Sequence, residues 1–405
     1  MNFDALIIKV ASRCNLNCSY CFMYNLGDTT YKNQPKFMSS DTVDAILQKT
    51  KIYIQQFQKK QFSFIFHGGE PLLTTKEFYK SFISKANQLV KELNDVTFFY
   101  DIQTNGVLID KEWLNLFKHL NIHPSISIDG TEKAHDMFRV DHQGNGSYHK
   151  VLQNTQLIKK HSNALDIACV INVNEKPLDV YESFKKMKAD TVNFLIPDYT
   201  HDNFPFNKQE TRMADWLIEL FDIWVNDANR YRIPMFIGFM NRFMRVHESE
   251  RNESTVLVIE TNGEIEAVDS LKACGNGFTK TGLTIKHHNF NDIKTSPLGN
   301  LYFGNYTTKL CYQCSECPLQ EICTGGRLVH RYSKKNGFNN PSVYCNDLIS
   351  FIAHMQHYFI ECYPELHASE NIEAIVPKEI QAYLSSLHST SHTLPIHQEL
   401  ETFSS

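Results

Sequence analysis

Three cysteines near the amino terminus, Cys14, Cys18 and Cys21, share one short segment behind an apolar run, Phe3 to Val10. A [4Fe–4S] cluster normally takes four thiolates, so three close cysteines can hold three irons and leave the fourth open to a substrate or cofactor. A structural zinc site prefers two C-x2-C pairs, and this triplet contains one. Disulfides fit poorly because three is odd and the spacings are tight. The spacing therefore favours a cluster with an open iron over zinc, disulfides or three ordinary buried thiols.

The segment C-N-L-N-C-S-Y-C, Cys14 to Cys21, resembles the C-x3-C-x-aromatic-C motif of radical S-adenosylmethionine (SAM) enzymes, with Tyr20 as the aromatic residue. In that family the open iron binds the amino and carboxylate groups of SAM. One electron from the reduced cluster splits SAM into methionine and a 5′-deoxyadenosyl radical, which removes a hydrogen atom from a substrate. The resemblance implies a [4Fe–4S] cluster, SAM and a reductant such as flavodoxin or ferredoxin, while the protein positions the reactants and excludes water.

Two further segments resemble the family's contacts to SAM. Gly68, Gly69 and Glu70 match the segment that holds the SAM amino group, since glycines allow close backbone approach and a carboxylate suits an ammonium. Taken alone, these residues could form a mere turn. Ser127 and Arg139 match the serine and arginine that touch the SAM carboxylate in the sulfatase-maturing and peptide-modifying branch. An arginine fork suits a carboxylate, although a lone arginine is usually a solvated surface charge.

Two other features near these segments are less specific. The stretch from Gln103 to Gly106 ends the third apolar run, and it fits an Asn-Gly turn as well as a site segment. His135, between Ser127 and Arg139, is expected to be structural.

A second set of cysteines lies in the last third of the chain: Cys311, Cys314, Cys317, Cys323 and Cys345. Its fourth member departs from bacterial ferredoxin spacing, and the set instead resembles the SPASM extension of peptide- and protein-modifying radical SAM enzymes. That resemblance implies that the last four cysteines hold an auxiliary [4Fe–4S] cluster. A zinc knuckle is the alternative, because four thiolates in pairs also suit zinc. Cys274 and Cys311 remain for a second auxiliary cluster, which two thiolates alone do not complete.

The chain departs from the family's full pattern at two positions. Arg327 stands where the family has another cysteine, four residues after Cys323. Gly275 follows Cys274 directly, where a carboxylate acts as base in sulfatase maturation. Gly275 therefore argues against sulfatase maturation, and no catalytic base can be assigned from the sequence.

Further blocks refine the resemblance. The segment H-R-Y from His330, the segment N-P-S-V-Y-C that ends at Cys345, and F-L-I-P-D from Phe194 resemble the cyclophane-forming (triceptide-type) branch. Enzymes of that branch join an aromatic ring to a β-carbon of a nearby residue in a ribosomally made precursor peptide. The implied reaction removes two hydrogens from the peptide, with the surplus electron leaving through the auxiliary cluster. Thioether formation and epimerisation are the alternative reactions, and a zinc-stabilised or electron-carrying binding module is the non-enzyme alternative.

The elements that must position these residues follow from periodicity. Short apolar runs alternate with helix-like segments, and the expected runs are Ala5–Val10, Phe62–Phe66, Thr97–Ile102, His123–Ile128, Asp166–Ile171 and Thr191–Ile196. Helices are expected at about 40–58, 76–94, 110–120, 148–161 and 178–188. Six βα-like units predict a parallel α/β sheet and are too few for a closed eight-stranded barrel. The resemblance implies an open partial (β/α)6 barrel with a C-terminal SPASM-type extension. The motifs follow the strand ends, where active sites of such sheets lie.

In the second half of the chain, the sequence predicts helices and a hairpin instead of further βα-like units. Residues 208–247 read as two aromatic-rich helices whose apolar stripes favour core over a peptide groove. Asn262-Gly263 between two apolar alternations predicts a hairpin over 256–268. The expected domains are a radical SAM barrel at 1–200, a helical bridge at 201–250, a SPASM domain at 251–360 and a tail at 361–405.

Composition bounds the class of protein and its partners. With 405 residues, 42% of them hydrophobic, and a net charge of −5, the chain can bury a large core and gives no sign of a nucleic-acid partner. It has no run approaching ~20 apolar residues and no charged leader, so we expect a cytoplasmic protein without a membrane partner. Eleven cysteines in clustered motifs indicate metal sites in a reducing compartment. Because the chain begins at the first expected strand, leader binding should fall to the barrel, the tail or a separate leader-recognition protein.

Overall fold

A computed structural model of the chain describes residues 3–93, 95–162, 164–244, 255–304, 307–365, 373–387 and 395–404. Packing divides the chain into two compact units, the first of residues 1–171, 182–196 and 252–304 and the second of residues 172–181, 197–251 and 305–405. These divisions differ from the expected limits at 200, 250 and 360, and the limit at 250 lies outside the described residues. They describe packing alone, so the functional domain limits stay a prediction.

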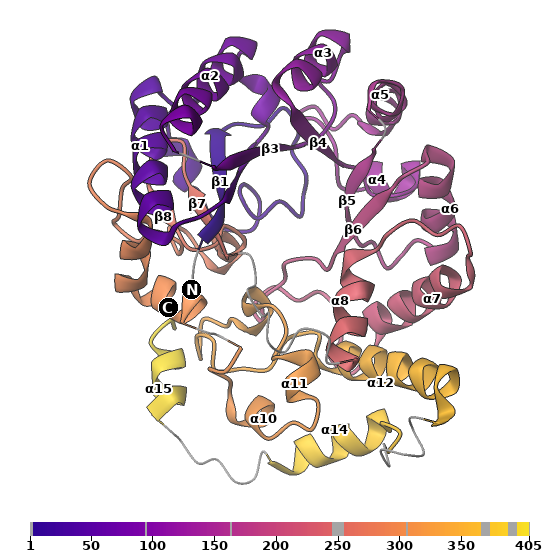
Figure 1. The fold of residues 1–405 in the computed structure, drawn as a ribbon. Helices are drawn as coiled ribbons and strands as arrows, with labels where there is room; N and C mark the ends of the chain where they lie inside the picture. Colours follow the sequence, from indigo (N-terminus) through magenta and orange to yellow (C-terminus); the bar gives the residue numbers. More distant parts are fainter. Residues whose placement is uncertain are drawn as a thin grey trace. The chain divides into compact units, whose positions relative to one another are not determined.

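The first unit is built on one eight-stranded α/β sheet of order β6-β5-β4-β3-β2-β1-β7-β8 (Figure 1). All pairs are parallel except β7 with β8, which form the expected hairpin. The strands are β1 Phe3–Ala11, β2 Gln61–Gly68, β3 Thr97–Thr104, β4 Ile122–Ser127, β5 Asp166–Val170, β6 Thr191–Leu195, β7 Thr255–Ile259 and β8 Ile265–Glu266. The six expected strands are confirmed. β7 pairs with β1, so this hairpin continues the sheet that the six strands form.

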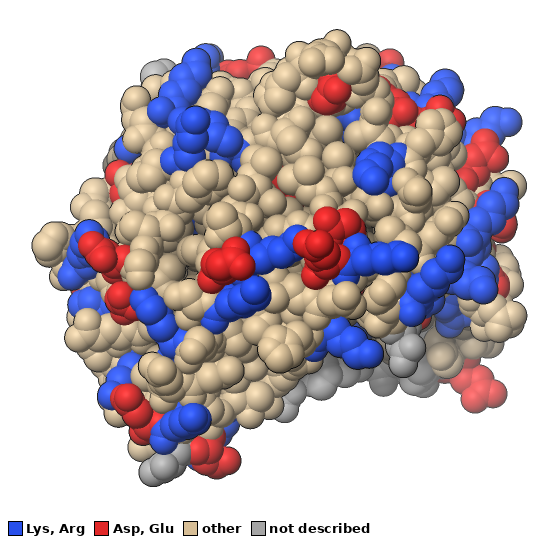
Figure 2. Space-filling model, turned by 90° about the horizontal axis from the view of Figure 1, so that it is seen from above, with Lys and Arg blue, Asp and Glu red and all other residues tan. Residues whose placement is uncertain are grey.

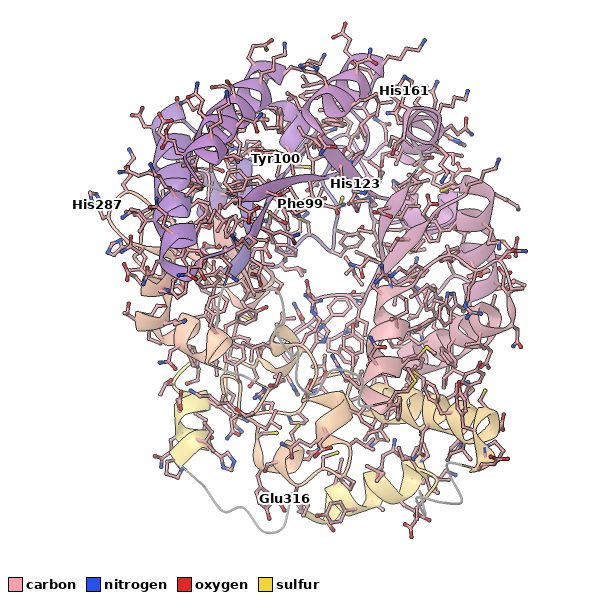
Figure 3. All side chains as sticks on the ribbon, in the orientation of Figure 1. Phe99, Tyr100, His123, His161, His287 and Glu316 are labelled. Atoms are coloured by element: carbon pink, nitrogen blue, oxygen red, sulfur yellow. The ribbon has the colours of Figure 1, made fainter. Side chains whose placement is uncertain are left out.

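Alternating burial along β2, β3 and β4 gives this sheet two faces. On one face Phe64 and Phe66 pack edge-on against Phe82 of the covering helix α2, with ring centroids 5.3 and 5.0 Å apart. Phe99 and His123, labelled in Figure 3, occupy the alternate positions of β3 and β4 and therefore the opposite face. The face of β2, β3 and β4 opposite α2 thus carries the polar and more exposed side chains.

Three long helices of the first unit begin at side-chain caps that the sequence supplies. Ser39, Thr75 and Asp110 accept hydrogen bonds from backbone N–H groups at the starts of α1, α2 and α3. The helices wholly within this unit are α1 Ser40–Phe57, α2 Lys76–Glu92, α3 Lys111–Leu120, α4 Glu132–Asp136, α5 Tyr148–His161 and α9 Pro297–Phe303. Helix α6, Pro177–Met187, has residues in both units.

The second unit is helical. Its helices are α7 Arg212–Asn226, α8 Pro234–Phe243, α10 Tyr312–Ser315, α11 Gln320–Cys323, α12 Cys345–Cys362, α14 Pro377–Ser386 and α15 Pro395–Glu401. Phe221 of α7 packs edge-on against Phe236 of α8 and Phe351 of α12, at 5.3 and 6.2 Å between centroids. The expected core role of the aromatic stripe is therefore confirmed for α7, whereas α8 buries Phe236 alone.

The expected tail contains two helices, α14 and α15. Leu384 of α14 and Leu400 of α15 are buried. Residues 366–372 and 388–394 of that tail lie outside the described residues. Within the described ranges, no helix has both the length and the apolarity to cross a membrane. On the face drawn in Figure 2, basic and acidic side chains are interspersed.

Candidate functional site

The loop that carries Cys14, Cys18 and Cys21 follows β1 and is held on one side by the end of β2. Backbone N–H groups of Gly69 and Glu70 donate to the carbonyls of Ala11 and Arg13, both at 2.9 Å. A Cβ on Gly69 would lie 1.9 Å from Oη of Tyr24 and 2.4 Å from the Arg13 carbonyl oxygen. Gly68 and Gly69 are therefore needed because the backbone at the end of β2 approaches the cysteine loop closely.

The segment after α4 holds the other side of the loop. Asn17 N–H donates to the Val140 carbonyl at 2.7 Å, and Ser19 N–H donates to the Phe138 carbonyl at 3.1 Å. The imidazole Nε2 of His142 lies 2.9 Å from the Cys14 carbonyl. The cysteine loop is thus fixed by contacts with the segments that follow β2 and β4.

The three thiols fit an iron–sulfur cluster by their chemistry. Burial, and then the charges of Glu70 and the neighbouring thiols, raise the pKa of Cys14 to about 12. Burial and the neighbouring Cys18 raise the pKa of Cys21 to about 11. Thiolates here consequently need a nearby cation, which cluster iron supplies. The Leu16 N–H already points at the Cys14 sulfur, at 3.4 Å.

Tyr20 links two charged groups. Its hydroxyl donates to Oδ2 of Asp129 at 2.5 Å and accepts from Nη1 of Arg139 at 2.7 Å. Arg139 is buried, and its Nε has no hydrogen-bond partner among the described residues. That unpaired donor fits an anionic group such as the SAM carboxylate.

The carboxylate of Glu70 accepts three hydrogen bonds from neighbouring residues. Its Oε1 accepts from Leu72 N–H at 2.9 Å and from the Thr104 hydroxyl at 2.6 Å, and its Oε2 accepts from Asn105 N–H at 2.8 Å. An ionised carboxylate has about four acceptor positions, so roughly one is left for the SAM ammonium. Ser127 accepts from Nε2 of Gln103 at 2.9 Å.

Two residues beside this site had no role assigned from the sequence. Nδ2 of Asn105 donates to Oδ1 of Asn15 at 2.8 Å and lies 3.7 Å from the Cys14 sulfur. Asp129 holds Tyr20 as above and accepts from Val170 N–H at 3.0 Å. Both follow strand ends in the sequence, and that position was the available signal. His135 accepts from Asp129 N–H at 3.2 Å and lies 2.8 Å from Ser147 Oγ, contacts that suit the expected structural role.

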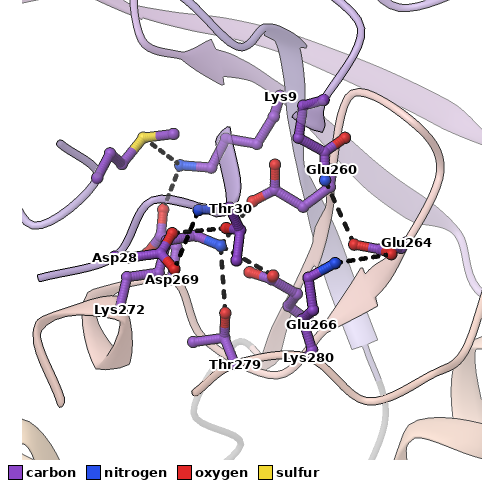
Figure 4. A network of polar contacts seen from close by, with 12 residues as sticks. Lys9, Asp28, Thr30, Glu260, Glu264, Glu266, Asp269, Lys272, Thr279 and Lys280 are labelled. Carbon is purple, nitrogen blue, oxygen red and sulfur yellow. Dashed lines mark hydrogen bonds and ion pairs between the residues drawn. The ribbon is translucent and has the colours of Figure 1, made fainter. Parts of the chain in front are cut away.

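Buried ion pairs hold the segment that carries Cys274 (Figure 4). Lys9 of β1 is fully buried and pairs with Asp269, at the start of the 3-10 helix Ser270–Cys274. Lys272 of the same helix lies 2.8 Å from Glu266. Because buried charges must be paired, these contacts fix the helix against the sheet. Cys274 therefore has a defined place in the first unit.

In the second unit, one cavity of about 350 Å³, measured to its open mouth, is lined by Cys314, Cys317, Cys323 and Cys345. These are the four cysteines that the SPASM resemblance singles out. Cys311 does not line the cavity and belongs to the second unit, whereas Cys274 belongs to the first. The ligand assignments stay predictions for all six cysteines.

The cavity also suits a cluster by its donors and its walls. Burial and the nearby Cys317 raise the pKa of Cys323 to about 11, so thiolates here again need a cation. Leu319 N–H lies 3.4 Å from the Cys317 sulfur, and Nε2 of Gln313 lies 3.9 Å from the Cys345 sulfur. The rest of the wall is formed by Leu319, Gln320, Gly325, Ile349, Ile352 and Leu384.

The blocks around these cysteines are joined to each other. Arg327, where the family has a cysteine, pairs with Asp198 at 2.5 Å. His330 Nε2 and the Tyr344 hydroxyl both lie 3.1 Å from the Pro197 carbonyl. Within the second unit, Pro197 and Asp198 of the first block thus contact the segments around Arg327, His330 and Tyr344.

Comparisons with known proteins agree with this geometry. The sequence model of the Radical SAM superfamily matches residues 8–184. An uncharacterised protein of Synechocystis is 30% identical over 370 residues, which covers 83% of this chain and 86% of that protein. The chain belongs to the radical SAM superfamily. Radical SAM enzymes use a [4Fe–4S] cluster and SAM, and these are therefore its cofactors.

Relatives and solved structures with descriptive names show which radical SAM proteins this chain is similar to. A cysteine-type anaerobic sulfatase-maturating enzyme of Clostridium novyi is 25% identical over 366 residues, covering 86% of this radical SAM chain and 94% of the relative. Among solved structures, anSMEcpe with bound AdoMet has a TM-score of 0.76 at 22% identity, covering 89% and 99% of the two chains. SuiB of Streptococcus suis bound to the precursor peptide SuiA has a TM-score of 0.51 at 16% identity, over 81% and 72%. These two structures support the fold.

Proposed function

We propose that this radical SAM enzyme modifies a ribosomally made precursor peptide by bonding an aromatic side chain to a β-carbon of a nearby residue. The observation that carries the proposal is the pairing of a three-cysteine loop in one unit with a four-cysteine cavity in the other. The crosslink breaks one C–H bond on each partner and forms one C–C bond, so the peptide loses two electrons and two protons. Bound SAM and its cluster would supply the radical that removes one hydrogen atom, an auxiliary cluster would accept the remaining electron, and the remaining proton would pass to water.

The residues of the first unit have distinct roles in the proposal. Cys14, Cys18 and Cys21 hold the cluster. Arg139 and Ser127 bind the SAM carboxylate, and Tyr20 keeps the guanidinium of Arg139 in place through its 2.7 Å hydrogen bond.

The SAM ammonium is bound by the segment after β2. Glu70 offers its remaining acceptor position, and Gly68 and Gly69 bring their backbone close to the cysteine loop. The buried surroundings of Glu70 strengthen that interaction, because the local dielectric is low.

In the second unit the proposal assigns the auxiliary cluster to the four cysteines of the cavity, with zinc as the alternative. Iron analysis of purified protein decides between the two metals. Cys274 and Cys311 stay proposed ligands of a second auxiliary cluster.

The proposed partners are a precursor peptide with a leader segment and a reductant such as flavodoxin or ferredoxin. A relative of known structure, SuiB, was solved with its precursor peptide, which supports a peptide substrate.

Sulfatase-type maturation is the second candidate, and the sulfatase-maturating relatives favour it. Against it stands Gly275, where that reaction would place its base. The backbone of Gly275 has φ 153°, and no atom lies within 4 Å of the position a Cβ would take. This space would admit a side chain at Gly275, although the backbone conformation would be strained. Gly275→Asp therefore tests whether a carboxylate there creates maturase activity on a sulfatase peptide.

Mass spectrometry tests the function directly. Reduced enzyme, SAM and the peptide encoded beside its gene should give a product two hydrogens lighter, whose fragments stay joined between the linked residues. A product that reacts with an aldehyde-trapping reagent would instead identify sulfatase-type oxidation. Unchanged mass with deuterium uptake from D2O would identify epimerisation, and a bond at a cysteine sulfur would identify thioether formation.

A further inference from the structure

The side-chain amide of Asn105 is buried beside the cysteine loop. Asn105 follows the last residue of β3 and is 6% exposed. Its Oδ1 accepts a hydrogen bond from the Val107 N–H at 3.0 Å. That bond fixes which end of the amide is the oxygen, since a backbone N–H needs an acceptor. The nitrogen Nδ2 is therefore the end of the amide that faces the loop.

Both hydrogens of this nitrogen have an acceptor in the loop. An amide nitrogen carries two hydrogens, and the acceptors are Oδ1 of Asn15 at 2.8 Å and the sulfur of Cys14 at 3.7 Å. The backbone N–H of Leu16 also donates to that sulfur, at 3.4 Å. The Cys14 sulfur thus accepts from a donor of its own loop and from a side chain at the end of another strand.

The turn that carries Asn105 is itself held in place. Its backbone N–H donates to Oε2 of Glu70 at 2.8 Å, and the Thr104 hydroxyl donates to Oε1 of the same carboxylate at 2.6 Å. Gly106 has φ 78°, a conformation that favours glycine, and its carbonyl accepts from Nδ2 of Asn154 at 2.8 Å. The amide of Asn105 is consequently directed at the Cys14 sulfur by its surroundings.

A hydrogen bond to a ligand sulfur changes the energy of cluster reduction. Reduction by one electron adds one negative charge to a cluster and its thiolates, and no covalent bond forms or breaks. A hydrogen bond strengthens as the charge on its acceptor grows, so an N–H at the sulfur stabilises the reduced state more than the oxidised state. Burial increases the difference, because the local dielectric is low. Hydrogen bonds to sulfur are among the features that set cluster potentials.

We propose that Asn105 raises the reduction potential of the cluster held by the cysteine loop, through its hydrogen bond to the sulfur of Cys14. The cluster then takes an electron more readily from a reductant such as flavodoxin or ferredoxin. The proposal rests on the part of the proposed function that assigns a cluster to Cys14, Cys18 and Cys21. It requires neither a peptide nor an auxiliary cluster. Asn105 is a positioning residue in this account, because it acts through Cys14.

An anaerobic redox titration of iron-loaded protein tests the proposal. The background is full-length Cys314→Ala protein, whose cavity lacks one of the four proposed auxiliary ligands. The electron paramagnetic resonance signal that changes when SAM is added identifies the loop cluster, since SAM binds the open iron there. The size of that signal at each potential reports the reduced fraction.

Two variants of Asn105 and one matched control are compared in this background. Asn105→Ala removes the donor. Asn105→Asp has nearly the same shape and keeps an acceptor for the Val107 N–H, but it places a carboxylate oxygen where the donor was. Asn25→Ala is the control, because Nδ2 of Asn25 holds the same loop through the Cys18 carbonyl, at 2.8 Å.

Asn105→Ala should lower the ratio of reduced to oxidised cluster about threefold to tenfold at a fixed potential, a shift of ~28 to ~59 mV to more negative values for a one-electron couple. Asn105→Asp should lower the ratio at least as far at about pH 8, where the aspartate is ionised. Asn25→Ala should leave the potential unchanged.

Three results would overturn the proposal. The first is an unchanged potential in Asn105→Ala or, if only that variant loses iron, in Asn105→Asp. The second is an equal shift in Asn25→Ala, because a loosened loop would then be the cause. The third is loss of iron from both Asn105 variants, which would make the residue structural.

The peptide assay separates this proposal from the proposed function. If the potential shifts as expected but the wild-type enzyme leaves every peptide unchanged, crosslinking fails and the role of Asn105 stands. If Cys14→Ala keeps the SAM-sensitive signal, the assignment of the cluster to the loop fails, and the role of Asn105 fails with it.

Discussion

The loop of Cys14, Cys18 and Cys21 and the cavity of Cys314, Cys317, Cys323 and Cys345 are two cysteine sites built in different ways. The first is one continuous segment held by backbone hydrogen bonds with its neighbours, and its three thiols are half-buried. The cysteines of the second site come from α10, the turn between α10 and α11, α11 itself and α12, and they surround a cavity with apolar walls. Three ligands leave an iron that another molecule can bind, while four complete the cluster. The difference matches the two proposed roles, cofactor binding at the loop and electron acceptance at the cavity.

Removing a ligand from each site should separate the two roles most strongly. Cys14→Ala should abolish release of 5′-deoxyadenosine and keep about four irons for each auxiliary cluster, whereas Cys314→Ala should keep SAM cleavage and lose peptide crosslinking. Iron analysis and chromatography of the nucleoside measure both. Equal loss of cleavage in the two variants would show that the sites are not separable.

Gly69→Ala should damage the first site without touching a ligand. Its new Cβ would collide with Tyr24 and the Arg13 carbonyl, so we expect a loss of about 1–3 kcal/mol of stability and poor cluster retention. The matched control is Gly238→Ala, which sits within α8 with open space around it. That change should be neutral or stabilise by up to about 1 kcal/mol. Thermal unfolding and iron content measure both, and normal iron in Gly69→Ala would contradict the packing account.

Arg139→Lys should weaken binding of SAM without removing the cluster. A hydrogen bond to a charged group contributes about 1.5–3 kcal/mol, so the Kd for SAM should rise roughly 10–100-fold. Equilibrium binding to anaerobically reconstituted enzyme measures this, with Arg230→Lys as control. A Kd unchanged by Arg139→Lys would mean that the buried Nε serves another group.

Leu384→Ala should have the smallest effect and should act on the second site alone. The side chain comes from α14 and helps to close the cavity, so its removal should admit solvent and make the auxiliary cluster bleach a few-fold faster in air. Leu178→Ala removes a 47% exposed leucine of the same unit and should not change the rate. Visible absorption follows the bleaching, and identical rates would remove α14 from the account of cluster protection.

Local patterns in the sequence predicted much of this structure. Short apolar runs located the six strands, and helix-like segments between them located the helices. The three-cysteine loop could be read because its ligands are close in sequence. The parallel pairing of β7 with β1 could not be predicted from the sequence, because about 250 residues separate the two strands and nothing local specifies their contact.

The residues that were missed are polar side chains whose role depends on burial. Asp129 looks like an ordinary residue after a strand, and Asn105 lies in a stretch that fits a turn as well as a site segment. Their importance follows from neighbours that come from distant parts of the chain, such as Cys14 for Asn105 and Tyr20 for Asp129. Leu384 belongs to a tail in which the sequence contained no motif, yet it lines the four-cysteine cavity.

Anaerobic cleavage of SAM tests the central claim most directly. Protein reconstituted with iron and sulfide, then reduced with dithionite, should release 5′-deoxyadenosine and methionine in equal amounts, and Cys14→Ala should release neither. Protein that binds no iron, or that binds iron but leaves SAM intact, would contradict the assignment of an open iron to the cysteine loop.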